Sequence, residues 1–118
     1  MNLDELERTR ADFEYDISLI STFDPLKRQL LQHAMEYLMQ RVAWALADQS
    51  ERATIDVTRS RAHNAFLATL NILTRNAANS GAKLEWRRRF AIQGQSQERK
   101  GLGDFACYLA FHTSIMAR

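Results

Sequence analysis

Apolar side chains recur every three or four residues along several stretches of this 118-residue chain, which is the spacing of helices with one buried face. The first stretch runs from about Leu3 to Thr22, and its apolar positions are Leu3, Leu6, Phe13, Ile17 and Ile20. A break follows at "TFDP", where Asp24 can accept a backbone hydrogen bond as the N-cap of a new helix. Pro25 suits the first position of that helix, because no N–H group is needed there.

The second predicted helix runs from Pro25 to about Ala47 and is apolar over most of its circumference. One line of residues keeps heptad spacing: Leu31, Met35, Leu38, Val42 and Ala45. A single line is consistently polar: Gln29, His33, Glu36 and Gln40. A helix with so little polar surface lies either at the centre of its own bundle or against another subunit.

Two further long helices are predicted in the second half of the chain. One starts between Thr54 and Arg59 and ends near Asn79, with Gly81 as its C-terminal cap. Its expected core positions are Ala62, Phe66, Leu70, Leu73 and Ala77. The other begins near Gly103, with Asp104 in its first turn, and runs to the end of the chain. Its buried face is expected to hold Leu102, Phe105, Leu109, His112 and Met116, and its uncharged middle must be inserted between other helices.

The stretch "LEWRRRFAI" is compatible with either a strand or a helix, since apolar residues alternate in it but Trp86 and Phe90 also stand one helical turn apart. A lone strand has no visible partner in the chain, so a short helix from about Ala82 to Ile92, closed by Gly94, is favoured. Residues 93–101 are then expected to form a loop.

These elements predict an all-α, four-helix bundle-like single domain over residues 1–118 with one additional short helix. The surplus apolar surface of the second and fourth long helices exceeds what one seam can cover, and this predicts a homodimer. The composition, 46% hydrophobic and 25% charged, is that of a folded domain. No apolar run reaches the roughly 18 residues of a membrane span, and the acidic N-terminus is unlike a signal peptide. We expect a cytoplasmic protein with no membrane partner, in keeping with the lone Cys107.

Charge is unevenly distributed along the chain. Residues 1–24 carry seven acidic residues against two arginines, whereas residues 81–118 carry seven basic residues against three acidic ones. The favoured interpretation is that the acidic first helix and the basic C-terminal third face each other, within one molecule or across a dimer. The alternative is a nucleic-acid surface, because clustered positive charge supplies most nonspecific affinity for phosphates.

No catalytic or metal-binding constellation emerges from the sequence. His33 and Glu36 stand one turn apart, but in the reverse order of the di-iron motif and on the polar line of their helix, so solvent exposure is expected. His112 shares an apolar stripe and is expected to be a hydrogen-bonded core histidine, and Cys107 an inert packed thiol. "GLGD" lacks the preceding strand and third glycine of a phosphate-binding loop. We therefore expect no enzymatic activity, no cofactor and no metal.

Candidate binding residues come from the asparagine-rich third long helix. Asparagine is a mediocre helix former, so four asparagines in one helix call for an explanation. The favoured one is a hydrated surface, and the alternative is a polar network across a helix–helix contact. If there is a ligand pocket, we expect it here, with these residues: His63, Asn64, Asn71, Arg75 and Asp104. The arginine run at 87–89 would be a neighbour.

Arginines beside aromatic residues, as in "EWRRRF", can also stack on bases and contact phosphates. The residues of this nucleic-acid alternative are Arg87, Arg88, Arg89, Arg99 and Lys100. No helix-turn-helix, ribbon or zinc pattern surrounds them, so a corner between two helices is favoured instead.

Three segments, "HNAFLATLNILTRN", "EWRRR" and "ERKGLGDFACYLA", resemble a family of small bacterial all-helical proteins with no assigned function. The resemblance covers roughly residues 59–110. It implies a compact helical fold and a bacterial cytosol, and it transfers no catalytic or binding residue. We expect a non-enzymatic interaction or regulatory module that works by helix–helix association, as a homodimer or with a protein partner. A weak nucleic-acid binder is the alternative.

Overall fold

The computed structural model describes residues 1–20, 25–91 and 95–116 of the chain. Five helices account for nearly all of these residues: α1 (Leu3–Ser18), α2 (Pro25–Leu46), α3 (Gln49–Asn79), α4 (Glu85–Ala91) and α5 (Gln95–Met116). The described residues contain no strand, so the predicted all-α class, with four long helices and a short one, is confirmed.

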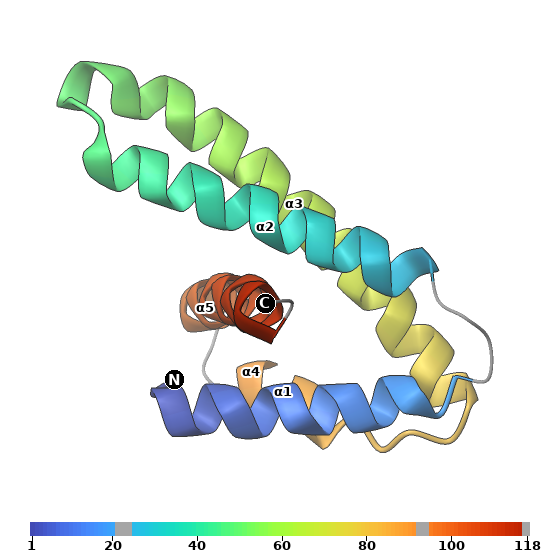
Figure 1. Ribbon diagram of the computed structural model, residues 1–118. Coiled ribbons are helices and arrows are strands. Elements are labelled where there is room, and N and C mark those ends of the chain that lie inside the picture. The colour runs from blue at the N-terminus through green and yellow to red at the C-terminus, as the bar shows by residue number, and fades with distance from the viewer. Residues whose placement is uncertain (21–24, 92–94, 117–118) are drawn as a thin grey trace.

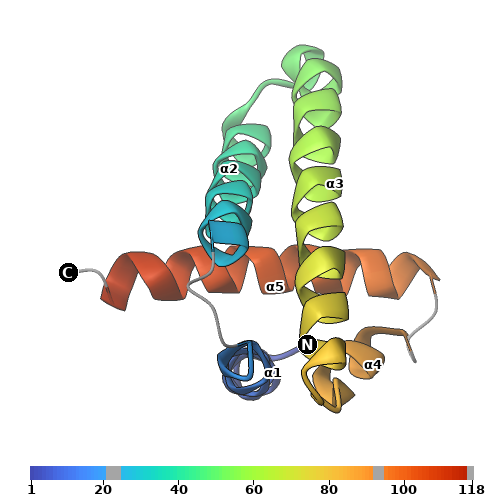
Figure 2. The same cartoon turned by 90° about the vertical axis from the view of Figure 1, so that its right-hand side faces the viewer.

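The helices are stacked across one another (Figure 1). Helices α2 and α3 form an antiparallel hairpin, and α5 runs across this hairpin with α1 and α4 on its other side, as the second view also shows (Figure 2). The far end of the hairpin projects beyond the other helices. None of residues 38–61, all of which the structure describes, is fully buried. We call this segment the α2–α3 arm.

An aromatic cluster joins α1, α4 and α5 at the centre of the molecule. The rings of Phe13 and Trp86 meet edge to face with centroids 5.2 Å apart, and Phe105 packs against both at 5.8 and 6.0 Å. Phe90 lies 5.6 Å from Phe105, and all four side chains are almost completely buried. Edge-to-face packing of this kind adds to the free energy gained from burying the rings. The short helix therefore exists because Trp86 and Phe90 anchor one of its faces.

The predicted capping role of Gly81 is confirmed. Its φ of +92° is a left-handed conformation that glycine adopts without steric cost. The N–H of Ala82 donates to the carbonyl of Ala77, and the N–H of Gly81 donates to that of Ala78. This pair of hydrogen bonds is a Schellman motif, which satisfies carbonyls at the end of α3 and turns the chain towards α4.

The core stripe predicted for α3 is confirmed, since Ala62, Phe66, Leu70, Leu73 and Ala77 are all buried. The predicted start of α3 is wrong, because the helix begins at Gln49. Its first turns lie in the arm, where the hairpin partner covers only one side, so their sequence has little of the apolar periodicity that the prediction required.

The predicted start of the last helix near Gly103 is wrong, and so is the predicted loop for the described residues 95–101. Helix α5 begins at Gln95 and continues through both glycines, so Asp104 lies in its interior instead of its first turn. Gly103 is buried where α5 crosses α2, and a Cβ built there would lie 2.7 Å from the hydroxyl oxygen of Tyr37. Gly103 therefore allows close packing of α5 against α2, whereas the sequence pattern alone indicates a helix start at this glycine.

The other helix ends lie near their predicted positions or outside the described residues. Helix α1 ends at Ser18, earlier than predicted, α2 ends at Leu46, and α4 begins at Glu85. The predicted cap at Asp24 and the predicted closure at Gly94 lie outside the described residues. Within the described residues, no helix has the length and apolarity to cross a membrane.

Candidate functional site

A largely apolar groove of about 500 Å³ lies among α1, α2 and α5. We call it the apolar groove, and its lining residues are Leu3, Leu6, Leu38, Arg41, Val42, Ala45, Asp104, Cys107, Tyr108 and Phe111. Helix α2 supplies four of them at i, i+3, i+4 and i+7, which is one continuous helix face. The groove therefore follows directly from the surplus apolar stripe of α2.

Large apolar side chains around this groove remain in contact with solvent. Leu46 is 83% exposed, Leu3 72% and Phe111 57%. Met39 and Leu46 flank Val42 on the same helix, one turn before it and one turn after it, and Met39 and Val42 are also exposed. Single exposed apolar residues are ordinary, but an apolar groove bordered by several of them is typical of interaction surfaces.

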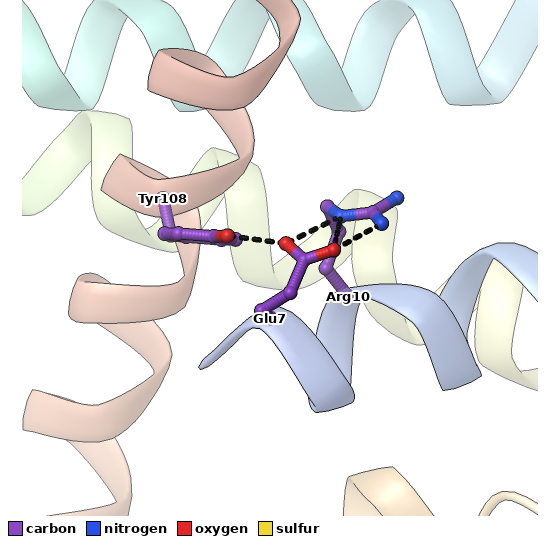
Figure 3. Close-up of polar contacts among 3 residues, drawn as sticks. All are labelled: Glu7, Arg10 and Tyr108. Carbon is purple, nitrogen blue, oxygen red and sulfur yellow. Dashed lines mark hydrogen bonds and ion pairs between the residues drawn. The ribbon is translucent and has the colours of Figure 1, made fainter. Parts of the chain in front are cut away.

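A polar cluster lies at the Tyr108 wall of the groove, where α1 meets α5 (Figure 3). The Glu7 carboxylate accepts hydrogen bonds from the Arg10 guanidinium and from the Tyr108 hydroxyl. These two hydrogen bonds, that of Arg10 first, lower the pKa of Glu7 from its usual 4.5 to about 2. The bond to Glu7 also raises the pKa of Tyr108. The cluster joins two helices far apart in sequence and fixes one wall of the groove.

The charged groups in the wall of the groove form a pair. An Nη1–H of Arg41 donates to Asp104 Oδ1 at 2.8 Å, and the same nitrogen lies 3.7 Å from Cys107 Sγ. Burial raises the pKa of the Cys107 thiol, although Arg41 acts in the opposite direction. A protonated thiol is a poor nucleophile, so this geometry does not favour covalent catalysis by Cys107.

Of the predicted binding residues, His63 and Asp104 lie on either side of Arg41. His63 is only 3% exposed, and its Nε2 lies 3.2 Å from the carbonyl oxygen of Arg99. Arg41 pairs with Asp104 and lines the same cavity as His63. The prediction that His112 would be the buried histidine is wrong. Its side chain is partly exposed, with its ring centroid 6.2 Å from that of Tyr108.

A hydrogen bond with the Asn64 side chain acts to raise the pKa of His63, whereas Asn71 and Arg75 do not converge with this histidine. Asn64, Asn71 and Arg75 are all exposed. Their exposure agrees with the prediction that the asparagine-rich face of α3 is a hydrated surface. His33, expected to be exposed, is partly buried, and its Nδ1 lies 3.5 Å from the Glu36 carboxylate.

The arginine run of α4 is largely taken up by ion pairs within the molecule. Arg87 Nη1 lies 3.2 Å from Glu98 Oε1, and Arg89 Nη2 lies 2.7 Å from Asp12 Oδ2 on α1. The acidic first helix and the basic C-terminal third thus face each other at Asp12. Arg88 is exposed.

Sequence reasoning missed two residues of α2 and α1 that matter here. The role of Arg41 cannot be predicted from the sequence, because a partner 63 residues away is not visible in a local pattern. Asp16 is buried and accepts a hydrogen bond from Trp86 Nε1 at 2.8 Å, again across α1 and α4. Within the described residues, no group of three or more His, Cys, Asp or Glu side chains is arranged to hold a metal.

Comparisons with protein-family models, curated proteins and solved structures find no match for the chain. The resemblance to small bacterial helical proteins therefore stays a sequence-based expectation.

Proposed function

We propose that this protein is a non-enzymatic interaction module that works by helix–helix association, and that its first partner is a second copy of the chain. The observation that carries the proposal is the apolar groove with its exposed rim. Apolar surface of this kind gains about 25 cal/mol for each Å² removed from water, so pairing two such faces is favourable. Helix surfaces rich in leucine, valine and phenylalanine pack well against one another.

The charge of the groove fits a second copy of the chain. In a two-fold symmetric dimer the same patch meets itself, so any net charge on it would repel its own image. Arg41 and Asp104 are the charged residues of the groove lining, and they neutralise each other. The exposed side chains of Met39 and Leu46 are not among the groove-lining residues, so one copy can offer projecting side chains where the other offers a hollow.

The proposal is tested by placing a charge in the groove. Val42→Glu and Phe111→Glu each bury an unpaired carboxylate if the groove is an interface, and this costs several kcal/mol of association free energy. Ile72→Glu is the matched control, since Ile72 is 42% exposed on α3 and is not among the groove-lining residues. Analytical ultracentrifugation should give dimers for the wild type and Ile72→Glu, and monomers for the other two.

Circular dichroism should show that all three variants keep the helical content of the wild type, because the substituted side chains are half exposed. Monomers in all four samples would contradict the proposal. So would dimers that survive both groove substitutions.

The nucleic-acid alternative has less support, because Arg87 and Arg89 already pair with carboxylates. Binding of mixed-sequence DNA or RNA that weakens steeply with salt would favour it.

A further inference from the structure

A second cavity lies where α2, α3 and α5 meet, and it differs in chemistry from the apolar groove. Its volume is about 370 Å³, which lies in the range of small-molecule sites. Four cationic side chains from three helices line it, together with a histidine and a tyrosine: Arg41, Arg59, Arg99, Lys100, His63 and Tyr37. No carboxylate is among the described residues that line it.

The positive charge of this cavity is only partly neutralised. Arg41 pairs with Asp104, and Arg59 Nη2 lies 2.7 Å from Asp56 Oδ1. Within the described part of the chain, no ion pair forms on Arg99 or on Lys100, which are neighbours on α5. Two unpaired cations beside two paired ones leave the cavity with a net positive charge, which attracts anions.

His63 provides a buried polar atom with no partner. Because a carbonyl oxygen can only accept, its contact with Arg99 makes Nε2 the protonated nitrogen, and Nδ1 is left as the second polar atom of the ring. Nδ1 is buried and has no hydrogen-bond partner among the described residues. Buried polar atoms are rarely left unpaired without a functional reason. Burial lowers the pKa of His63, and the charges of Arg99 and Arg59 act in the same direction, against the hydrogen bonds to the Arg99 carbonyl and the Asn64 side chain, which raise it.

The position of the histidine is fixed by its neighbours. The Tyr37 ring packs against His63 edge to face, with centroids 5.5 Å apart. Tyr37 in turn lies against α5 at Gly103, where no side chain intervenes. The three helices therefore hold His63 in place, with the cations of α2, α3 and α5 around it.

We propose that this cavity binds the phosphate group of a small phosphorylated molecule. Arginine guanidinium groups match phosphate oxygens with paired, charge-assisted hydrogen bonds, and lysine adds a point charge. The His63 ring adds a polar side chain to the lining of the cavity. A bound anion would thus neutralise the two free cations together.

A single phosphate group fits these charges better than a nucleic-acid backbone. A backbone needs a track of free cations, whereas two of the three arginines of α4, Arg87 and Arg89, are paired with Glu98 and Asp12. The neighbouring cations Arg99 and Lys100 instead line one cavity together. The site is separate from the apolar groove except for Arg41, which lines both.

The test is a titration of the full chain with phenyl phosphate, followed by NMR shifts and calorimetry. Arg99→Gln/Lys100→Gln removes the two free cations and should weaken binding about ten-fold or more, since a charge-assisted hydrogen bond is lost with each. Arg75→Gln/Arg88→Gln is the matched control, because it removes the same charge from two exposed positions that do not line the cavity. The control should bind phenyl phosphate as the wild type does. All four positions are exposed, so both variants should keep the fold.

Inorganic phosphate and a single-stranded DNA oligonucleotide are titrated in parallel. The proposal expects shifts of the His63 and Tyr37 resonances with phenyl phosphate, and weaker binding of the oligonucleotide per phosphate. Absence of binding, or equal weakening in both double variants, would overturn it. Tighter binding of the oligonucleotide, weakened by the control variant, would overturn it in favour of nucleic acid.

Discussion

At the scale of single residues, contacts between distant helices set the properties of this protein. Glu7 is the clearest case, because its carboxylate accepts from both Arg10 and Tyr108 and its pKa falls to about 2. A carboxyl whose pKa is lower in the folded state stabilises the fold above its unfolded pKa, near 4.5. That contribution is lost as the pH falls from about 4.5 to about 2.

We predict that Glu7→Gln lowers the urea midpoint at pH 7 and that the difference from the wild type disappears towards pH 2. The amide does not ionise, so this part of the acid sensitivity is removed. Tyr108→Phe removes one of the two hydrogen bonds and should show a smaller effect of the same sign. Urea unfolding curves at several pH values check this. A difference that stays constant from pH 7 to pH 2 would show that Glu7 acts through packing alone.

Gly103 illustrates a residue whose role only the tertiary structure reveals. Gly103→Ala gains about 1 kcal/mol of helix propensity, but forcing a methyl group against a packed ring costs about 1–3 kcal/mol. We predict a net loss of about 1 kcal/mol in the free energy of unfolding. Tyr37→Phe removes the hydroxyl oxygen that would lie 2.7 Å from the new Cβ, so Gly103→Ala should be near neutral in that background. A double-mutant cycle by urea unfolding measures the coupling between Gly103→Ala and Tyr37→Phe. Additive effects of the two substitutions would contradict close packing of Gly103 against Tyr37.

At the scale of elements, periodicity predicts which segments are helical but not all of their ends. The α3 core stripe follows from apolar spacing, and Gly81 follows from its place after the last apolar turn. The starts of α3 and α5 could not be predicted in the same way. The first turns of α3 lie in the projecting arm, where few positions need to be apolar. The glycines of α5 resemble a turn until their packing against Tyr37 is known.

The candidate sites, too, could be predicted from the sequence only in part. The surplus apolar face of α2 is visible in the sequence, and it lines the groove. His63 and Asp104 are predicted as binding residues, but only His63 lines the basic cavity, which also depends on Tyr37, Arg41 and residues of α5. Those contacts join helices far apart in sequence, which no local pattern encodes.

The turn from α3 to α4 supplies a test at this scale. Gly81 has a φ of +92° and open space where a Cβ would point, so Gly81→Ala changes the backbone energy alone. We predict a loss of about 1–2 kcal/mol in the free energy of unfolding. Gly81→Asn should cost less, because asparagine tolerates the left-handed conformation better. Thermal or urea unfolding ranks the three proteins, and equal stability of all three would contradict the capping role.

At the scale of the whole molecule, two surfaces of different chemistry lie on either side of Arg41. The apolar groove is proposed to bind a second copy, and the basic cavity is proposed to bind a phosphorylated small molecule. Arg41 contributes to both linings. The α2–α3 arm, with Val57 and Leu46 exposed near its end, extends the apolar surface beyond the compact part of the fold.

The most direct test of the central claim is the mass of the protein in solution as a function of concentration. Sedimentation equilibrium up to about 100 µM covers the range of weak specific association. If apolar surface is buried between two copies, we predict a mass of twice the 13.6 kDa of one chain. This association should persist in high salt, because it does not depend on ion pairs. A single 13.6 kDa species over the whole range would contradict the account.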